Sequence, residues 1–245
     1  MPSSPLSTGA ERSERTHTGA SHARPPELPR LELADVSKRW RQGDPLLDRL
    51  DLTLQPGTQT LVIGDNGVGK TTLLRVASGL IAADTGVVRI DGLAADRARG
   101  EYQRRVGFVS AGSTGLYARL TVAGHLELWA RLALVQASER RRRVAEVLER
   151  FELDEIRSQR ADRLSMGQRQ RLRLAMAFLH RPTLLLLDEP WNSLDESGIQ
   201  LVSGAIEEAV VDGVSALLCV PTGHDLELAS ADRVYMLRAG KLTAT

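Results

Sequence analysis

Apolar and polar positions along the chain follow two patterns that are typical of strands. Residues 31–36 and 50–54 alternate apolar with polar side chains, as half-buried strands do. Residues 59–63 and 184–187 are instead short, mostly apolar runs, which favour strands buried on both faces. Further short β-rich runs lie at 87–90, 106–109, 214–220 and 233–237.

Between these runs, apolar residues spaced three and four apart predict helices. Helices are expected at 69–78, behind N-cap residues Thr121, Ser138 and Ser165, and near 196–211. Because strands alternate with helices, the sequence predicts an α/β fold with a mostly parallel core sheet. The helical block at about 112–178 is expected to form a subdomain on that core.

The first 29 residues differ from the rest in composition. They contain five of the ten prolines and almost no large apolar residue. Such a segment cannot bury enough apolar surface to offset its ordering entropy, so we expect a disordered tail at 1–29 and one folded domain at 30–245. No apolar stretch approaches the roughly 18–20 residues that a membrane-spanning helix needs.

Charge and cysteine content exclude several classes of function. The formal net charge of +1 argues against a strongly basic nucleic-acid-binding protein, so no nucleic-acid partner is expected. The single cysteine, Cys219, excludes an internal disulfide and a zinc site made of several thiolates. We expect it to pack in the core.

Residues 64–72 fit the phosphate-loop pattern G-x-x-x-x-G-K-[ST], between a predicted strand and a predicted helix. The glycines let backbone N–H groups turn toward phosphate oxygens, and the helix N-terminus adds partial positive charge. Lys70 is expected to reach the β- and γ-phosphates, and the Thr71 hydroxyl to bind Mg²⁺. The expected nucleotide-binding residues here are Gly64, Asp65, Asn66, Gly67, Val68, Gly69, Lys70, Thr71 and Thr72.

Two carboxylates follow the apolar run at 184–187. At the carboxyl end of a parallel strand, where ligands bind in open α/β sheets, Asp188 is expected to hold Mg²⁺ through its water shell. Glu189 is the candidate general base that polarises the attacking water.

A short motif at 164–171, Leu-Ser-Met-Gly-Gln-Arg-Gln-Arg, opens the helix before that strand. Ser165 and Gln168 fit a capping box at a helix N-terminus. A capped helix start with a glycine for close approach is also suited to bind an anion, so the two interpretations are compatible.

The order of these motifs resembles the ATP-binding cassette (ABC) family, from about Leu31 to the C-terminus. Residues 64–72 look like its Walker A motif, 184–189 like its Walker B motif, 164–168 like its LSGGQ signature with Met166 for the first glycine, and 192–195 like its D-loop. His224 falls where the family has its switch histidine. Trp40 takes the place of the aromatic residue that stacks on adenine, although a core aromatic at a strand end is the alternative.

This resemblance implies a P-loop NTPase of the ABC type, with a parallel core sheet, an antiparallel β subdomain and a helical subdomain. Two such domains would pair head to tail around two ATP molecules, with Ser165, Gly167 and Gln168 of one facing the nucleotide of the other. Closure of the pair would depend on the γ-phosphate, which His224 would contact while holding the water and Glu189 in register. The implied cofactors are ATP and Mg²⁺.

The sequence departs from the family at the glutamine that usually follows the strand written here as 106–109. In the family it helps to coordinate Mg²⁺ and senses the γ-phosphate. Counting places it at Ala111, and no glutamine occurs from 110 to 121. The hydroxyl of Ser113 or Thr114 could substitute for the missing glutamine side chain. The Tyr-Ala-Arg-Leu-Thr run at 117–121 resembles exporter-type members.

The favoured function is therefore a transport-coupled ATPase subunit. It would hydrolyse ATP as a homodimer or pseudo-dimer and drive a separate integral membrane permease from the cytoplasmic face of the cell membrane. A non-transport ABC ATPase acting on ribosomes or DNA is the alternative. A small-molecule P-loop kinase is disfavoured by the signature motif, since a kinase has no use for an opposing nucleotide site.

Overall fold

The computed structural model describes residues 28–40, 43–112, 115–223 and 230–245 of the chain. Its strands are β1 (Leu31–Lys38), β2 (Leu47–Leu54), β3 (Gln59–Ile63), β4 (Thr85–Ile90), β5 (Leu93–Ala94), β6 (Val106–Val109), β7 (Leu184–Asp188), β8 (Ser215–Val220), β9 (Arg233–Arg238) and β10 (Lys241–Ala244). Its α-helices are α1 (Lys70–Ala77), α2 (Arg99–Arg104), α3 (Val122–Leu132), α4 (Ala137–Arg150), α5 (Met166–Phe178) and α6 (Glu196–Val211), and short 3₁₀ turns lie at Asp154–Ile156 and Ala161–Arg163.

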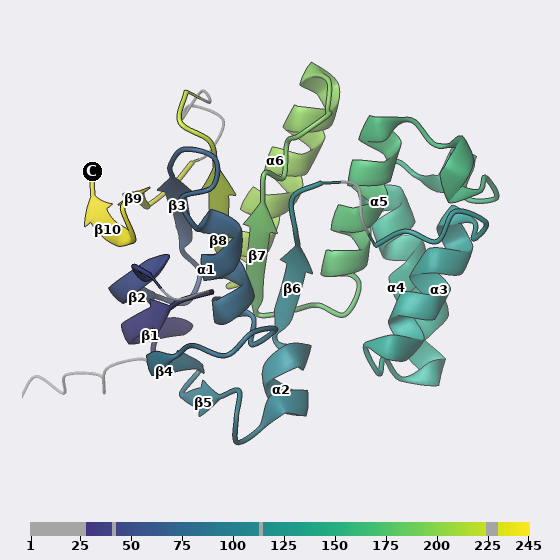
Figure 1. Ribbon diagram of the computed structural model, residues 1–245. Helices are drawn as coiled ribbons and strands as arrows, with labels where there is room; N and C mark the ends of the chain where they lie inside the picture. Colours follow the sequence, from purple (N-terminus) through teal and green to yellow (C-terminus); the bar gives the residue numbers. More distant parts are fainter. Residues whose placement is uncertain (1–27, 41–42, 113–114, 224–229) are drawn as a thin grey trace, which may run out of the picture.

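The strands form two sheets (Figure 1). The core sheet has the order β10-β9-β3-β8-β7-β6, and all of its neighbouring strands are parallel except the β9–β10 pair. The second sheet, β2-β1-β4-β5, is antiparallel throughout. The predicted mostly parallel core with an antiparallel β part is thus confirmed.

The central strands β3, β7 and β8 are buried on both faces, which explains why they read as continuous apolar runs. The buried apolar side chains form two hydrophobic clusters. In β7, Leu185 and Leu187 belong to the first cluster, whereas Leu184 and Leu186 belong to the second. The first cluster includes side chains of α3 to α6, and the second includes α1 and the antiparallel sheet. Cys219 on β8 is fully buried in the second cluster, as expected of a packing residue.

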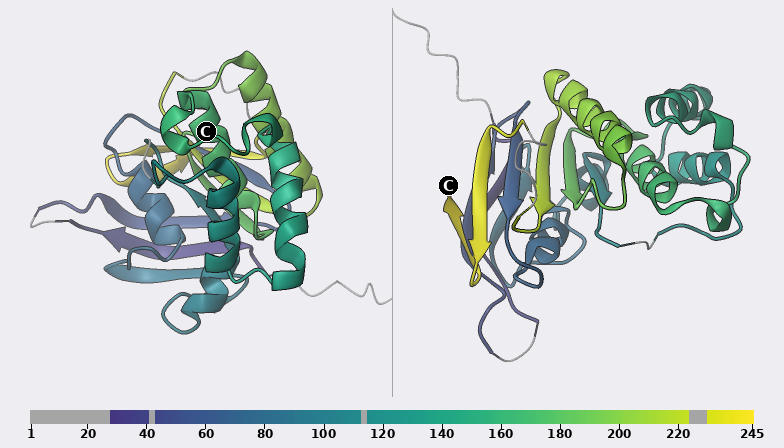
Figure 2. Two further views of the ribbon diagram at one scale, coloured as in Figure 1. Left: turned by 90° about the vertical axis from the view of Figure 1, so that its right-hand side faces the viewer. Right: turned by 90° about the horizontal axis from the view of Figure 1, so that it is seen from above.

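Helices α3, α4 and α5 gather beside the free edge of the core sheet at β6, on the right of Figure 1 and the far right of the top view in Figure 2. Phe151 and Phe178 meet edge to face there, with ring centroids 5.2 Å apart. Among the described residues, no helix combines the length and apolar content needed to cross a membrane.

One predicted helix start is wrong. Ser138 was expected to cap the helix that contains Val144, but α4 already begins at Ala137, with Gln136 in the cap position and no side-chain cap. The carbonyl of Gln136 accepts hydrogen bonds from the N–H groups of Glu139 and Arg140. Ser138 therefore lies inside the first turn.

Candidate functional site

The candidate site lies where the parallel strands of the core sheet end. Strands β3, β6, β7 and β8 run in the same direction, so the segments that follow them leave from the same edge of the sheet, at the top of Figure 1. These segments carry the phosphate-loop motif, Ala111, the Asp188–Glu189 pair and Thr222. Motifs far apart in the sequence are therefore brought to one place by the sheet.

The phosphate loop joins β3 to α1 with the backbone shape that its glycines allow. Gly67 and Gly69 have φ values of +83° and +115°, which favour glycine strongly. A Cβ on Gly64 would lie 2.6 Å from the carbonyl oxygen of Leu237 on β9, so a side chain at this position would collide with the neighbouring strand. Helix α1 begins without a side-chain cap, which leaves its first N–H groups suited to bind an anion.

The Lys70 side chain crosses the loop. Its Nζ donates to the carbonyl oxygens of Gly64 at 2.6 Å and Asp65 at 3.0 Å, and the residue is buried. The Asp65 side chain is fixed in turn by the Thr222 hydroxyl from the segment after β8. An ammonium held in the phosphate loop, at the uncapped start of α1, is well placed to neutralise phosphate charge.

Thr71 and Asp188 form the contact at the centre of the site. The Thr71 hydroxyl donates to Oδ2 of Asp188 at 2.6 Å, although the two residues lie far apart in the sequence. The Asp188 carboxylate is almost fully buried at the end of β7. A hydroxyl and a carboxylate at this distance are hard oxygen donors of the kind that Mg²⁺ prefers, with phosphate and water oxygens supplying the other ligands. These two residues therefore fit a magnesium ion.

Glu189 follows Asp188 in an unusual backbone conformation. Its φ is +49°, the left-handed region that residues other than glycine rarely adopt. Its N–H is anchored on the carbonyl oxygen of Cys219 at 2.8 Å, and its Oε2 accepts a hydrogen bond from Nδ2 of Asn192 at 3.2 Å. The backbone turn and this side-chain bond orient the half-buried Glu189, which lines the same pocket as Asp188.

Trp40 lies beside the phosphate loop and not in the core. The residue is 55% exposed, and its indole Nε1 donates to the Thr72 hydroxyl at 3.3 Å. The interpretation of Trp40 as a core aromatic is therefore wrong. Nζ of Lys38 lies over one face of the ring, 5.6 Å from its centroid. The other face of this exposed indole is suited to stack on a base.

The motif at 164–168 forms the predicted capping box. The Ser165 hydroxyl accepts from the N–H of Gln168, and the Gln168 side chain accepts from the N–H of Ser165. A Cβ on Gly167 would lie 3.1 Å from the carbonyl oxygen of Ser193, so this helix start packs closely on the D-loop segment. Figure 1 places the start of α5 on the opposite side of β7 from α1, and Met166 exposes 53% of its surface there.

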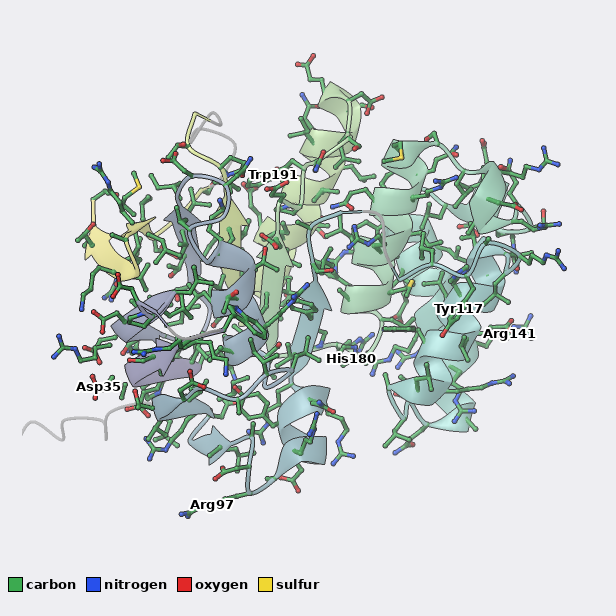
Figure 3. All side chains as sticks on the ribbon, viewed as in Figure 1. Asp35, Arg97, Tyr117, Arg141, His180 and Trp191 are labelled. Carbon is green, nitrogen blue, oxygen red and sulfur yellow. The ribbon has the colours of Figure 1, made fainter. Side chains whose placement is uncertain are left out.

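His224, Ser113 and Thr114 lie outside the described residues. Trp191 is buried beyond the upper end of β7 (Figure 3). Its Nε1 donates to the Ser203 hydroxyl at 3.0 Å. Burial, and next the charge of Asp188, raise the pKa of the Cys219 thiol well above its ordinary value, as fits a packing role.

Sequence reasoning missed two side chains of α5 at this edge. Gln170 and Arg173 are both buried, and they contact the backbone of the segments after β7 and β6. The only signal in the sequence is an arginine among apolar residues on the buried side of the helix. Because arginine is common throughout this chain, that signal is weak.

Comparisons with known proteins agree with the motif order. Residues 47–192 match the family model of the ABC transporter. The chain is 29% identical over 217 residues to the ABC transporter ATP-binding protein NatA of Bacillus subtilis, covering 86% of this chain and 87% of that one. It is 34% identical over 218 residues to the Fe(3+) ions import ATP-binding protein FbpC of Yersinia pestis, covering 86% of this chain but only 60% of that longer relative.

A solved structure is similar in fold over nearly the same span. It is a dimeric ATP-binding cassette in a post-hydrolysis state bound to ADP and Pi, with a TM-score of 0.76 and 26% sequence identity, covering 88% of this chain and 97% of that chain. The motif order, the two-sheet fold and the match to the family model lead to one conclusion: this chain belongs to the ABC transporter family.

Proposed function

We propose that this chain binds MgATP, hydrolyses it as one of a head-to-tail pair, and thereby drives a separate membrane permease. The observation that carries the proposal is the 2.6 Å contact between Thr71 and Asp188 at the end of the phosphate loop, with Glu189 next in the chain. The family is one of ATPases, which supports hydrolysis as the activity of this member.

Each side chain at this edge has a role that its chemistry suits. Lys70 and the first N–H groups of α1 would neutralise phosphate charge, and Trp40 would stack on the base. Thr71 and Asp188 would hold Mg²⁺, which when bound supplies further charge neutralisation on the phosphates. Glu189 would accept the proton of the attacking water.

The proposed pair makes use of the start of α5. Ser165, Gly167 and the capping box present a helix N-terminus at the same edge as the phosphate loop, on the other side of β7. A helix N-terminus attracts anions, so the α5 start of one copy would face the phosphates bound to the other. His224 keeps its proposed role as the switch histidine. The dimeric cassette with ADP and Pi supports this arrangement by similarity.

The membrane partner is proposed from the relatives. NatA is named an ABC transporter ATP-binding protein, and FbpC an import ATP-binding protein. By analogy, this chain would lie on the cytoplasmic face of the membrane, bound to a permease near its helical part. Because the relatives include an import protein, the exporter-type resemblance of the 117–121 run stays a prediction.

The test is a pull-down of the Glu189→Gln variant, with ATP, from detergent-solubilised membranes of the native host. Slow hydrolysis should prolong the ATP-bound pair, and we expect a protein with several membrane spans to be recovered in a fixed ratio. The Lys70→Met variant, which should bind ATP weakly, is the matched control. Recovery of ribosomes or DNA without any membrane protein would contradict the proposal and favour the non-transport alternative.

A further inference from the structure

Arg173 is a buried cation in the middle of α5. It is only 8% exposed, and its neighbours Leu172 and Leu174 are fully buried. A buried charge is costly unless it is paired or well hydrogen-bonded, so the position of this guanidinium requires an explanation. Burial lowers the pKa of Arg173, and the Asp188 carboxylate opposes that shift.

The guanidinium holds the segment that follows β6. Nη1 donates to the carbonyl oxygen of Gly112, and Nη2 donates to the carbonyl oxygen of Ser110. The two carbonyls flank Ala111, so one side chain of α5 fixes the backbone on both sides of this alanine. A planar guanidinium suits this task because its donors project in a fixed fork.

Ala111 is in turn bonded to Asp188, the carboxylate proposed to hold Mg²⁺. Its N–H donates to Oδ2 of Asp188 at 3.2 Å, the same oxygen that accepts from Thr71 at 2.6 Å. A continuous series of hydrogen bonds therefore runs from α5 through the backbone of Ala111 to Asp188 and the first turn of α1.

Gln170 extends the series to the segment after β7. Its Oε1 accepts from Nη1 of Arg173 at 3.0 Å, and its Nε2 donates to the carbonyl oxygen of Pro190 at 3.0 Å. Arg173 and Gln170 thus tie the segments after β6 and β7 to the helix that begins at the capping box of Ser165.

This arrangement falls at the position where the resemblance to the family fails. A glutamine at 111 could offer a side-chain oxygen to Mg²⁺, whereas alanine has none. Arginine cannot replace that ligand, because a guanidinium is a cation with no acceptor. It can, however, fix the backbone that bonds to Asp188.

We propose that Arg173 is a positioning residue that links the magnesium site to α5 in this chain, in place of a glutamine side chain at 111. The inference rests on the proposed function, in which Asp188 holds Mg²⁺. By holding 110–112, Arg173 keeps the Ala111 N–H on Asp188 and fixes the orientation of that carboxylate. Outer partners of this kind typically contribute about 10- to 100-fold to metal affinity.

The test compares Arg173→Met with Arg171→Met. Methionine keeps an aliphatic stem and removes the guanidinium. Arg171 is a matched control because it lies on the same helix but donates to Phe151 and pairs with Glu152, away from the 110–112 segment. ATP affinity is measured by calorimetry with Mg²⁺ and with EDTA. The Mg²⁺ concentration for half-maximal hydrolysis is measured in parallel.

We expect Arg173→Met to bind ATP in EDTA as tightly as the unmodified chain does. The factor by which Mg²⁺ increases ATP affinity should be about 10-fold smaller in this variant than in the unmodified chain. Half-maximal hydrolysis should need about 10-fold more Mg²⁺, and Arg171→Met should change neither quantity. Adding Ala111→Gln to Arg173→Met should restore most of the response to Mg²⁺. Should Arg173→Met fail to fold, Arg173→Lys, which keeps the charge but not the fork, should show a smaller shift in the same direction.

Two results would overturn the inference: an unchanged Mg²⁺ response in the folded variants, or an equal loss of affinity with and without Mg²⁺. A double variant no better than Arg173→Met would contradict the replacement of the glutamine. An unmodified chain whose ATP affinity does not respond to Mg²⁺ would instead refute the proposed magnesium site itself, so the two failures are distinguishable.

Discussion

The Glu189→Gln variant is expected to hydrolyse ATP about two to four orders of magnitude more slowly than the unmodified chain, the usual contribution of a general base. Glutamine has almost the same shape as glutamate but cannot accept a proton from water. The strained backbone at φ +49° and the bond from Asn192 can both persist, because the amide still offers an oxygen. Phosphate release measures the rate, and calorimetry measures ATP affinity, which should be retained.

The matched control for this variant is Glu208→Gln. Glu208 is an exposed glutamate of α6 that pairs with Arg150, away from the strand ends, so its neutralisation should leave hydrolysis unchanged. Undiminished turnover by Glu189→Gln would show that another group accepts the proton.

Lys70→Met is expected to weaken ATP binding by roughly 10- to 100-fold, as the loss of a charge-assisted hydrogen bond to phosphate implies. Methionine keeps the length of the side chain while removing the ammonium that now bonds to Gly64 and Asp65. Hydrolysis should fall as well, since Lys70 is placed to neutralise charge on the transferred phosphate. Calorimetric titration with ATP and Mg²⁺ measures the affinity.

Lys241→Met is the control for the loss of a lysine. Lys241 is partly exposed and pairs with Asp48, on β10 and β2. Its removal should leave ATP affinity unchanged. In Lys70→Met the carbonyl oxygens of Gly64 and Asp65 lose their hydrogen-bond donor, which could destabilise the fold. The thermal unfolding temperatures of both variants are therefore measured to check that each remains folded. Equal ATP affinities of Lys70→Met and Lys241→Met would contradict the phosphate-binding role of the loop.

Much of the fold follows from the sequence because the burial pattern dictates it. The apolar run at 184–187 predicts a strand covered on both faces, and β7 has one cluster on each side. The helix expected near 196–211 is α6, with Asp195 capping its start. By contrast, α2, β5 and β10 were not predicted, because segments of two to six residues are too short to show a period.

The candidate site was predictable to the extent that its residues follow parallel strands. Thr71 and Asp188 were each expected to hold Mg²⁺, and the structure brings their side chains into contact because β3 and β7 end at one edge. The role of Arg173 could not be read from the sequence, because its partners are backbone carbonyls, which leave no trace in side-chain identity. At Ser138 the sequence predicted a helix cap that the structure does not have. A residue type that favours the cap position does not set the helix start when the helix already begins before it, as α4 does at Ala137.

Hydrolysis of MgATP by this chain is tested most directly by the rate of phosphate release from ATP by the purified, unmodified chain, measured with Mg²⁺ and again with EDTA. We expect hydrolysis with Mg²⁺ that falls to the background rate when EDTA removes the metal, because Thr71 and Asp188 are placed to hold it. A folded chain that binds ATP but releases no phosphate with Mg²⁺ would contradict the proposed ATPase activity. One that hydrolyses ATP equally fast in EDTA would contradict the proposed magnesium site.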